Sequence, residues 1–341
     1  RVYNTIKRTV EEGTSLKRRI FDWAVATGKA AVAARKNGSV GPMLAVQQKL
    51  AHQLVFAKLH ERLGGNLRFA VSGGAALPRE VGEFFEAAGI MIIEGYGLTE
   101  TAPVLSVNPW GLPRYGTVGH VIPGVTVAIQ SLEDGRILGQ LSGEDYPSTL
   151  STAEGEILAK GPNVMKGYWN RDEATREAID AQGWYHTGDV GRFDDGYLTI
   201  TDRIKHMIVS AGGKNIYPGP IEERFKSLTM IDQIVVIGER RDYLTALVVP
   251  NLDVLKQYAG DRGIAVESDE QLLSHPDIQK RFDDEFRAYS RGAAAHEKIR
   301  AFRLLSEPFT VENGLLTPTM KPRRRQIEER YAELIEAMYR A

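Results

Sequence analysis

A short run in the chain combines residue types that could bind a nucleotide. Residues 94–101 read Glu-Gly-Tyr-Gly-Leu-Thr-Glu-Thr and follow the apolar segment 90–93, which predicts a short buried strand. Gly95 and Gly97 would let a ligand come close to the backbone. Tyr96 offers a flat face for a base. The run therefore predicts a nucleotide contact at the end of a strand.

The same run ends in a hydroxyl and a carboxylate. Thr99 can hydrogen-bond a phosphate oxygen, and Glu100 can bind a hard divalent cation, which prefers oxygen ligands. Glycine-rich turns after strands are common and often only structural. A nucleotide with its metal is therefore a hypothesis that needs support from other parts of the chain.

Two stretches further along offer groups for a sugar or a phosphate. Asp189 ends Tyr-His-Thr-Gly-Asp at 185–189, which predicts a turn, and its carboxylate could accept hydrogen bonds from both ribose hydroxyls. A lone aspartate of this kind more often bonds its own backbone. Arg203 could bind ribose or phosphate with its planar guanidinium group. The alternative role for Arg203 is a surface ion pair with Asp202.

A glycine turn and a loop lysine complete the set of five stretches. The turn at 73–77, Gly-Gly-Ala-Ala-Leu, follows the alternating segment 67–72. Lys321 ends Gly-Leu-Leu-Thr-Pro-Thr-Met-Lys at 314–321 and could carry a point charge to a site on another domain. An exposed loop lysine without such a role is the commoner case.

The elements around the first stretches predict an α/β sheet. Helical spacing of apolar residues covers 1–63 with a break at 37–42. A strand at 67–72, the glycine turn, a helix at 79–87 that Pro78 can open, and the strand at 90–93 follow in order. Strand, turn, helix and strand in this order are typical of an α/β sheet.

Later segments predict a β-rich region and a second domain. From about Gly116, short strands alternate with turns, and the polar stretch 133–153 is expected to be an exposed loop. A candidate domain boundary lies at 202–205. The expected elements are strands at 125–130, 155–159 and 196–200 and a helix at 171–180, then strands at 207–210, 233–238 and 244–249 and helices at 218–227, 251–259, 268–290 and 326–338.

Composition excludes several classes of function. The 341 residues carry a net charge of −1, so nothing favours a nucleic-acid partner, and the basic run 321–325 is expected to be a solvated face. With no cysteine, the chain has no disulfide, no thiolate metal site and no cysteine nucleophile. It contains neither a His-Glu-x-x-His pair nor a Gly-x-Ser-x-Gly elbow. No apolar run approaches the roughly 20 residues of a membrane helix.

The order and spacing of the five stretches resemble the adenylate-forming enzyme superfamily, which includes acyl- and aryl-coenzyme A ligases, firefly luciferases and peptide-synthetase adenylation domains. Within it, the chain resembles the long-chain fatty-acid–coenzyme A ligases. The resemblance extends over essentially the whole chain. The runs that carry this second likeness are 54–59, 61–65, 72–77, 94–101 and 312–319.

The resemblance implies a mixed fold of α/β and α+β parts. Residues 1–201 would be the C-terminal part of a large adenylation domain. They would include a β-rich subdomain, a distorted barrel, at about 116–201. Residues 202–341 would form a smaller, mobile α+β lid domain.

The resemblance also assigns roles to individual residues. Around the base and the acyl group, Gly73, Gly74 and Ala75 would line the adenine and acyl side of the pocket, and Gly95, Tyr96 and Gly97 would pack on adenine and the acyl-phosphate region. For the phosphates and the ribose, Thr99 would bind a phosphate oxygen, Glu100 would bind magnesium, and Asp189 would hold the ribose with help from Arg203. In the second domain, Asp202 would be the hinge, Gly212 and Gly213 would border the coenzyme A channel, and Lys321 would contact the carboxylate and the α-phosphate.

The implied reaction uses ATP, Mg²⁺ and coenzyme A. A long-chain fatty acid would become an acyl-adenylate and then acyl-coenzyme A, with release of pyrophosphate and AMP. The partners would be these small molecules and no nucleic acid. A cytoplasmic location is expected, with loose contact to a membrane surface as a further option.

One departure from the family leaves alternatives open. The glycine- and hydroxyl-rich phosphate loop of the family is absent, as is a Walker-type loop, and the chain starts at Arg1 without an initiator Met. We therefore expect the C-terminal portion of a longer enzyme. A fatty-acyl-AMP ligase that loads a carrier protein, with 133–153 as its insertion, is one alternative. A non-catalytic adenylate-binding module is the other.

Overall fold

The computed structural model describes residues 2–11, 13–318 and 320–340, so that Thr319 of the run 312–319 lies outside the described residues. The chain divides into two compact units, residues 1–201 and residues 202–341. Each unit has its own hydrophobic clusters and is described by itself.

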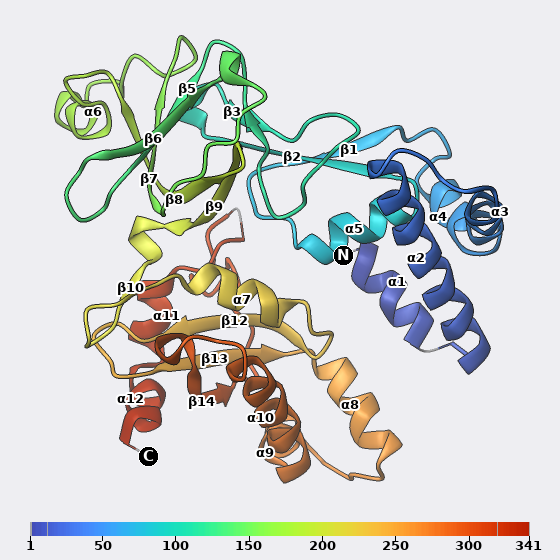
Figure 1. Ribbon diagram of the computed structural model, residues 1–341. Coiled ribbons are helices and arrows are strands. Elements are labelled where there is room, and N and C mark those ends of the chain that lie inside the picture. The colour runs from blue at the N-terminus through green and yellow to red at the C-terminus, as the bar shows by residue number, and fades with distance from the viewer. Residues whose placement is uncertain (1, 12, 319, 341) are drawn as a thin grey trace. The chain divides into compact units, whose positions relative to one another are not determined.

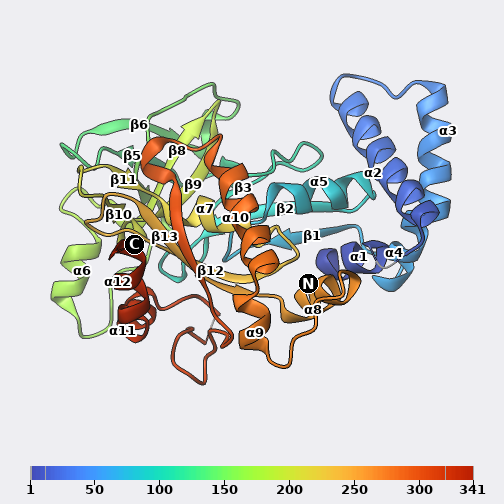
Figure 2. The same ribbon diagram turned by 90° about the horizontal axis from the view of Figure 1, so that it is seen from below.

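The first unit begins with helices, as the apolar spacing predicts. Thr14 caps the long second helix by accepting the Lys17 N–H at 3.3 Å, and Pro42 occupies the first turn of the third helix. Helices α2 and α3, which come before and after the predicted break at 37–42, pack against each other (Figure 2). The elements are α1 (Val2–Glu11), α2 (Ser15–Lys36), α3 (Pro42–Ala51), the π-helical turn η1 (His52–Phe56) and α4 (Ala57–Arg62).

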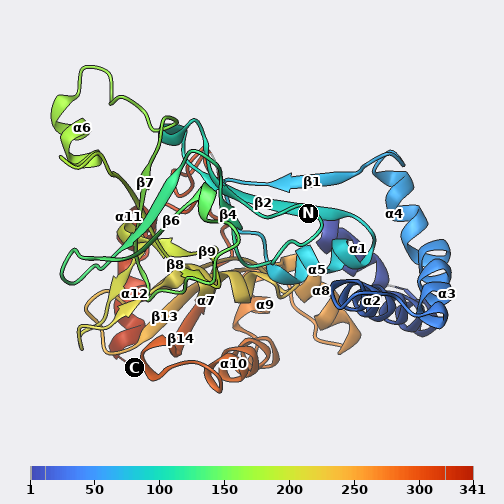
Figure 3. The same ribbon diagram turned by 45° about the horizontal axis from the view of Figure 1, so that its top comes forward.

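A four-stranded sheet follows in the order β1-β2-β3-β4. Strands β1 and β2 are parallel and side by side, with Ser72 opposite Glu94, and α5 connects them (Figure 3). β2 pairs antiparallel with β3, and β3 with β4. The bounds are β1 (Phe69–Ser72), α5 (Arg79–Ala87), β2 (Met91–Gly97), β3 (Val104–Val107) and β4 (His120–Val121). The predicted order of strand, turn, helix and strand is confirmed.

Strand β2 is longer than the predicted segment 90–93, because it continues through Gly97. The glycine–tyrosine–glycine run is therefore the end of a strand, and the turn comes after it. Backbone packing explains Gly97, since a Cβ there would lie 1.7 Å from the Pro103 carbonyl oxygen. Only glycine lets the returning chain come this close.

The β-rich part is a five-stranded sheet in the order β6-β5-β7-β8-β9. Strands β6 and β9 are its two edges, so within the described residues the sheet is open and the expected barrel is not closed. The alternating apolar residues of β5 and β7 form the core of this sheet. The bounds are β5 (Thr126–Gln130), β6 (Ile137–Ser142), β7 (Gly155–Lys160), α6 (Asp172–Ala178), β8 (Tyr185–Asp194) and β9 (Tyr197–Arg203).

The expectation that 133–153 is an exposed loop is wrong for its middle part. β6 lies within this stretch and pairs antiparallel with β5. Leu138, Leu141 and Leu150 pack against the core of the sheet. The polar turns on both sides hide this short apolar alternation in the sequence. The middle of the stretch is thus an edge strand of this sheet.

The second unit is built on a three-stranded sheet in the order β12-β13-β14 (Figure 1). β12 and β13 are antiparallel, whereas β13 and β14 are parallel. The bounds are η4 (Ile204–His206), β10 (Ile208–Val209), β11 (Asn215–Ile216), α7 (Pro218–Lys226), β12 (Ile231–Ile237), β13 (Leu244–Pro250), α8 (Leu252–Asp261), α9 (Asp269–Ser274), α10 (Pro276–Ser290), β14 (Ile299–Leu304), α11 (Arg324–Arg330) and α12 (Ala332–Arg340).

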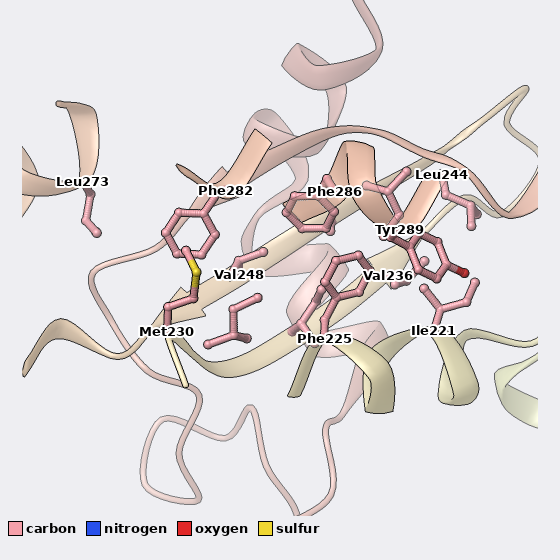
Figure 4. Packing of buried hydrophobic residues seen from close by; sticks show 14 of the residues in the cluster. Ile221, Phe225, Met230, Val236, Leu244, Val248, Leu273, Phe282, Phe286 and Tyr289 are labelled. Carbon is pink, nitrogen blue, oxygen red and sulfur yellow. The ribbon is translucent and has the colours of Figure 1, made fainter. Parts of the chain in front are cut away.

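Helices cover both faces of this sheet. On one face, Phe225 of α7 and Phe286 of α10 pack with ring centroids 4.5 Å apart over Val236 and Val248 (Figure 4). The opposite face is covered by α11, α12 and the preceding loop, through residues such as Phe309. Because both faces are buried, β12 and β13 are almost continuously apolar, and this made them easy to predict.

Two predictions for this unit need correction. The sequence reasoning missed β14, and it joined α9 to α10 and α11 to α12, where His275 and Tyr331 separate them. The basic run 321–325 is not a uniformly solvated face either. Arg324 is only 17% exposed because its guanidinium donates to the Glu222 carboxylate at 2.5 Å. Among the described residues, no helix combines the length and the apolarity needed to cross a bilayer.

Candidate functional site

The end of β2 and the middle of β8 bring two predicted site residues together. The Tyr96 hydroxyl donates a hydrogen bond to Asp189 Oδ2 at 2.6 Å. Tyr96 is 8% exposed and Asp189 is 7% exposed. A hydrogen bond to a carboxylate is roughly twice as strong as a neutral one. This contact therefore fixes both side chains across a separation of 93 positions in the sequence.

An irregularity in the β7–β8 pairing sets the position of Asp189. Between the pairs Glu156–Val190 and Leu158–His186, one residue of β7 faces three of β8. Gly188, in the middle of the three, has a φ of +67°, which favours glycine. The predicted turn at 185–189 is thus a bulge inside a strand, and bulges often re-aim a side chain beside a functional site.

Local hydrogen bonds hold the bulge in place. The Thr187 hydroxyl donates to the Ile157 carbonyl at 2.7 Å and accepts the Asp189 N–H at 3.0 Å. The Glu156 carboxylate accepts the Gly188 N–H at 3.2 Å and contacts His186 Nδ1 at 3.0 Å. The Asp189 N–H is thus capped by the Thr187 hydroxyl.

The turn after β2 presents Thr99 and Glu100. The hydroxyl of Thr101 accepts the Leu98 N–H at 3.0 Å and donates to the Pro103 carbonyl at 2.6 Å. These bonds close the 3₁₀ turn η2 (Thr99–Thr101), so that Thr99 is exposed and Glu100 is partly exposed. A hydroxyl and a carboxylate thus stand next to each other at the surface.

The glycine turn after β1 lies beside β2. A Cβ on Gly73 would be 3.6 Å from the Gly95 carbonyl oxygen, which is ordinary contact, and Gly74 has a φ of +79°. Gly73, Gly74 and Ala75 are all exposed. The two predicted glycine-containing runs are therefore neighbours in space, as the parallel pairing of β1 and β2 requires.

Glu94 is the first residue of the run 94–101, and the sequence reasoning gave it no role of its own. It is 5% exposed, and its Oε2 has no hydrogen-bond partner among the described residues. Burial raises the pKa of Glu94 to about 7, although the backbone N–H groups of Gly116 and Leu77 oppose this. The available signal in the sequence was a carboxylate that directly follows the buried apolar segment 90–93. A carboxylate is rarely buried without a partner, so this position could have drawn attention.

Asp202 and its neighbours stand at the start of the second unit. Asp202 is 9% exposed and accepts the Arg203 N–H and the Gly219 N–H, each at 2.7 Å. Burial alone would raise the pKa of Asp202, but His206, these two N–H groups and the charge of Arg324 lower it overall. The carboxylate is therefore a fixed anchor at the boundary between the units.

The remaining predicted residues of the second unit lie on exposed turns. Gly212 and Gly213 belong to the turn between β10 and β11, where Gly213 has a φ of +71°. Lys321 is exposed on the loop before α11, and its N–H donates to the Thr317 hydroxyl at 3.0 Å. The Thr317 N–H returns a bond to the Lys321 carbonyl at 2.8 Å.

Sequence reasoning missed the contacts of Tyr168 and Tyr185. The Tyr168 hydroxyl donates to Glu100 Oε1 at 3.0 Å, and the Tyr185 side chain lies beside Tyr168. Burial raises the pKa of the Tyr185 hydroxyl above its usual range. The run Gly-Tyr-Trp at 167–169, two aromatics behind a glycine, was the available signal.

Comparisons with known proteins agree on one family. Residues 21–169 match the model of the AMP-binding enzymes, and residues 205–341 match the C-terminal domain of AMP-binding enzymes. A long-chain-fatty-acid–CoA ligase, FadD15 of Mycobacterium bovis, is 35% identical over an aligned length of 341 positions, which covers 99% of this chain and 53% of that protein. The peroxisomal long chain acyl-CoA synthetase 7 of Arabidopsis thaliana is 34% identical over 99% of this chain and 47% of that protein. The chain thus spans about half the length of the curated relatives it matches.

Solved structures give the same result. The adenylation domain of a carboxylate reductase from Mycobacterium chelonae has a TM-score of 0.64 at 27% identity, over 93% of this chain and 45% of that one. The A domain of a carboxylic acid reductase from Segniliparus rugosus, solved with AMP and a co-purified carboxylic acid, has a TM-score of 0.61 at 26% identity, over 93% of this chain and 45% of that one.

Proposed function

Because this chain belongs to the AMP-binding, adenylate-forming enzymes, we propose that it takes part in ATP-dependent activation of a long-chain fatty acid and its transfer to coenzyme A. The observation that carries the proposal is the 2.6 Å hydrogen bond from Tyr96 to Asp189. It joins the segment assigned to adenine and the segment assigned to ribose. The names of the relatives support the fatty acid and coenzyme A as substrates.

In the first half-reaction, a carboxylate oxygen of the fatty acid attacks the α-phosphorus of ATP. The bond between that phosphorus and the bridging oxygen to the β-phosphate breaks, and pyrophosphate leaves. Tyr96, together with Gly95 and Gly97, would pack against adenine and the acyl-phosphate region, and Asp189 would hold the ribose hydroxyls with Arg203 assisting. Gly73, Gly74 and Ala75 would line the same pocket, which their exposure and their position beside Gly95 support.

Charge has to be neutralised because both reactants are anions. Thr99 would hydrogen-bond a phosphate oxygen, and Lys321 would contact the carboxylate and the α-phosphate as the new bond forms. The exposed position of both side chains is compatible with these roles. A flexible lysine acts as a point charge, which suits a contact that is made in one step and released in the next.

The donor set fits magnesium that arrives with ATP. The described residues contain no cluster of three or more histidine, aspartate or glutamate side chains that could hold a metal ion. Mg²⁺ is usually bound by one or two carboxylates together with substrate phosphates, and Glu100 is such a carboxylate on a surface turn. When bound, the ion would neutralise the phosphate charge that develops in the reaction.

In the second half-reaction, the sulfur of coenzyme A attacks the adenylate carbonyl. The bond from the carbonyl carbon to the phosphate oxygen breaks, AMP leaves, and the thiol proton passes to solvent. Lys321 would have to move away first. Asp202, at the boundary between the two units, is the proposed hinge, and Gly212 and Gly213 would then border the coenzyme A channel. The hydrogen bonds that the Asp202 carboxylate accepts from the Arg203 and Gly219 N–H groups would hold its side chain in place during this movement.

Two further features of the protein are part of this proposal. The family's phosphate loop would come from an upstream segment, because this chain spans about half the length of its curated relatives. We also propose that the enzyme works in the cytoplasm. Loose contact with a membrane surface would bring it close to its fatty substrate.

Magnesium-dependent ATP–pyrophosphate exchange with a long-chain fatty acid tests the proposal. It should be measured on this chain and on a version extended upstream, with reactions lacking the fatty acid as the control. We expect exchange in the extended version. Exchange in neither version would overturn the proposed function and favour a non-catalytic adenylate-binding module. Product analysis with coenzyme A and with a carrier protein then identifies the acceptor.

A further inference from the structure

The turn that carries Glu100 is held from outside by one segment, residues 161–168, which we name the clasp segment. The Asn163 side chain donates to the Thr101 carbonyl at 2.8 Å and to the Val104 carbonyl at 2.9 Å. The Met165 N–H donates to the Glu100 carbonyl at 2.7 Å. The backbone at Glu100 and just after it is thus bonded to the segment that follows β7.

Tyr168, at the end of the clasp segment, contacts the Glu100 side chain itself. Its hydroxyl donates to Glu100 Oε1 at 3.0 Å. Tyr185, which is 3% exposed and belongs to the core of the β-rich sheet, lies beside Tyr168. A hydrogen bond to a carboxylate is stronger than one between neutral groups, so this single contact can orient the Glu100 side chain.

Tyr168 is itself held by backbone contacts that do not involve its hydroxyl. Its N–H donates to the Thr175 hydroxyl at 2.9 Å, and that hydroxyl donates to the Arg171 carbonyl at 2.9 Å. The ring position is therefore set by the start of α6. Loss of the hydroxyl alone should leave the segment in place and release only the Glu100 carboxylate.

We propose that Tyr168 is a positioning residue that orients the Glu100 carboxylate for the magnesium ion of ATP. The inference rests on the proposed function, because it takes Glu100 as the metal-binding residue. Partners that hold a ligating carboxylate fix its orientation, and their loss typically costs about 10–100-fold in metal affinity. Tyr168 is 37% exposed, so the lower end of this range is expected here.

Metal-dependent ATP binding provides the test. The affinity for ATP would be measured by titration calorimetry with Mg²⁺ and with EDTA, and Mn²⁺ binding in the presence of ATP by electron paramagnetic resonance. The variants are Tyr168→Phe, Glu100→Gln and the double variant. Tyr146→Phe is the matched control, because Tyr146 is 55% exposed and contacts the His120 ring with its own ring.

We expect Tyr168→Phe to weaken metal-dependent binding about 10-fold and to leave binding in EDTA unchanged. In the Glu100→Gln background, the same substitution should have almost no further effect, because Tyr168 acts through Glu100. A structural role alone would weaken binding with and without the metal and would add to Glu100→Gln.

Two outcomes would contradict the inference in distinguishable ways. Wild-type affinity for the metal and ATP in Tyr168→Phe, or equal losses with Mg²⁺ and EDTA, would overturn the role of Tyr168 alone. Failure of the wild-type protein, including its upstream-extended version, to bind ATP in a metal-dependent manner would overturn the proposed function and this inference together.

Discussion

Three proposed site residues of the first unit are held differently from those on the exposed turns of the second unit. In residues 1–201, Tyr96 and Asp189 are 8% and 7% exposed and hydrogen-bonded to each other, and Glu100 is fixed by the clasp segment. In residues 202–341, Gly213 and Lys321 lie on exposed turns, where the Gly213 N–H donates to the Ser210 carbonyl and the Lys321 N–H donates to the Thr317 hydroxyl. Only Asp202 is buried in this second set.

The difference separates preorganised residues from residues that can move. A buried, hydrogen-bonded side chain contributes to the stability of its unit as well as to a ligand contact. An exposed loop side chain contributes little to stability and can serve one reaction step without restricting the next. We therefore expect substitutions in the first set to change stability and binding together, and those on the exposed turns to change activity alone.

The largest effect on stability is expected in the framework of the second unit. Arg324→Ala would leave Glu222, a 5% exposed carboxylate that also accepts the Val236 N–H at 2.8 Å, without its cation. Breaking a buried ion pair typically costs about 3–5 kcal/mol. Hydrogen exchange of the β12 amides should therefore become much faster.

The control for this prediction is Arg325→Ala. Arg325 is 84% exposed and pairs with Glu329 on its own helix, so the β12 amides should keep their exchange rates. Equal exchange in the two variants would show that the rigid framework does not depend on the buried pair.

Lys321→Ala should affect activity without affecting stability. Adenylate formation, measured as ATP–pyrophosphate exchange in a protein that carries the phosphate loop, should fall about 10²–10³-fold. Thioester formation from supplied acyl-adenylate should change far less, because the lysine is assigned to the first half-reaction. Equal losses in both steps would contradict this role, and lower thermal stability would contradict the comparison between the two sets.

Asp189→Ala should affect stability and binding together. It removes the acceptor of the Tyr96 hydroxyl and leaves that hydroxyl buried, at a cost of about 1.5–3 kcal/mol in the free energy of unfolding. Tryptophan fluorescence reports this unfolding, because all four tryptophans lie in residues 1–201. Affinity for AMP should fall in parallel.

Glu177→Ala, at an exposed carboxylate of α6, is the control for this prediction and should change neither quantity. If Asp189→Ala weakens AMP binding while the urea midpoint stays at the wild-type value, the hydrogen bond to Tyr96 does not stabilise the unit.

Glu94 makes the stability of the first unit depend on pH. Its folded-state pKa of about 7 exceeds the usual glutamate pKa of 4.5, so the folded protein keeps a proton that the unfolded chain loses. The stability contribution is complete below about pH 4.5 and is lost as the pH rises through about 7. The free energy of unfolding should fall by on the order of 2 kcal/mol between about pH 5 and about pH 8.

Urea unfolding followed by tryptophan fluorescence measures this pH dependence. Glu94→Gln keeps the size and the neutral form of the side chain, so it should flatten the curve in this range. An unchanged curve in Glu94→Gln would show that another group carries the pH dependence.

Local sequence signals predicted most of the elements that carry the site. The apolar runs of β12 and β13, the helices 79–87 and 218–227, and the glycine turn at 73–77 follow from short-range patterns. Their boundaries shifted where tertiary pairing extended a strand, as in β2, which runs through Gly97. β14 was missed because a short, half-polar strand on one edge is stabilised by its neighbour β13 and not by its own residues.

The candidate site was predicted as a set of residues, without their contacts. The five stretches and their resemblance to a family named Tyr96, Asp189 and Glu100. The donors and acceptors that join them come from positions 68 to 93 apart, and no periodicity relates such positions. Tyr168 went unnoticed for this reason, although it contacts the proposed metal-binding carboxylate.

The sequence by itself determined which side chains are available for chemistry, because residue type sets charge, hydrogen-bonding capacity and backbone freedom. It also determined the helices and the fully buried strands, whose patterns are local. Only the tertiary structure decided that Asp189 sits on a bulge facing Tyr96, that Glu94 is buried and that Arg324 neutralises Glu222. Burial and pairing depend on residues far along the chain, and they set pKa and orientation through desolvation and hydrogen bonding.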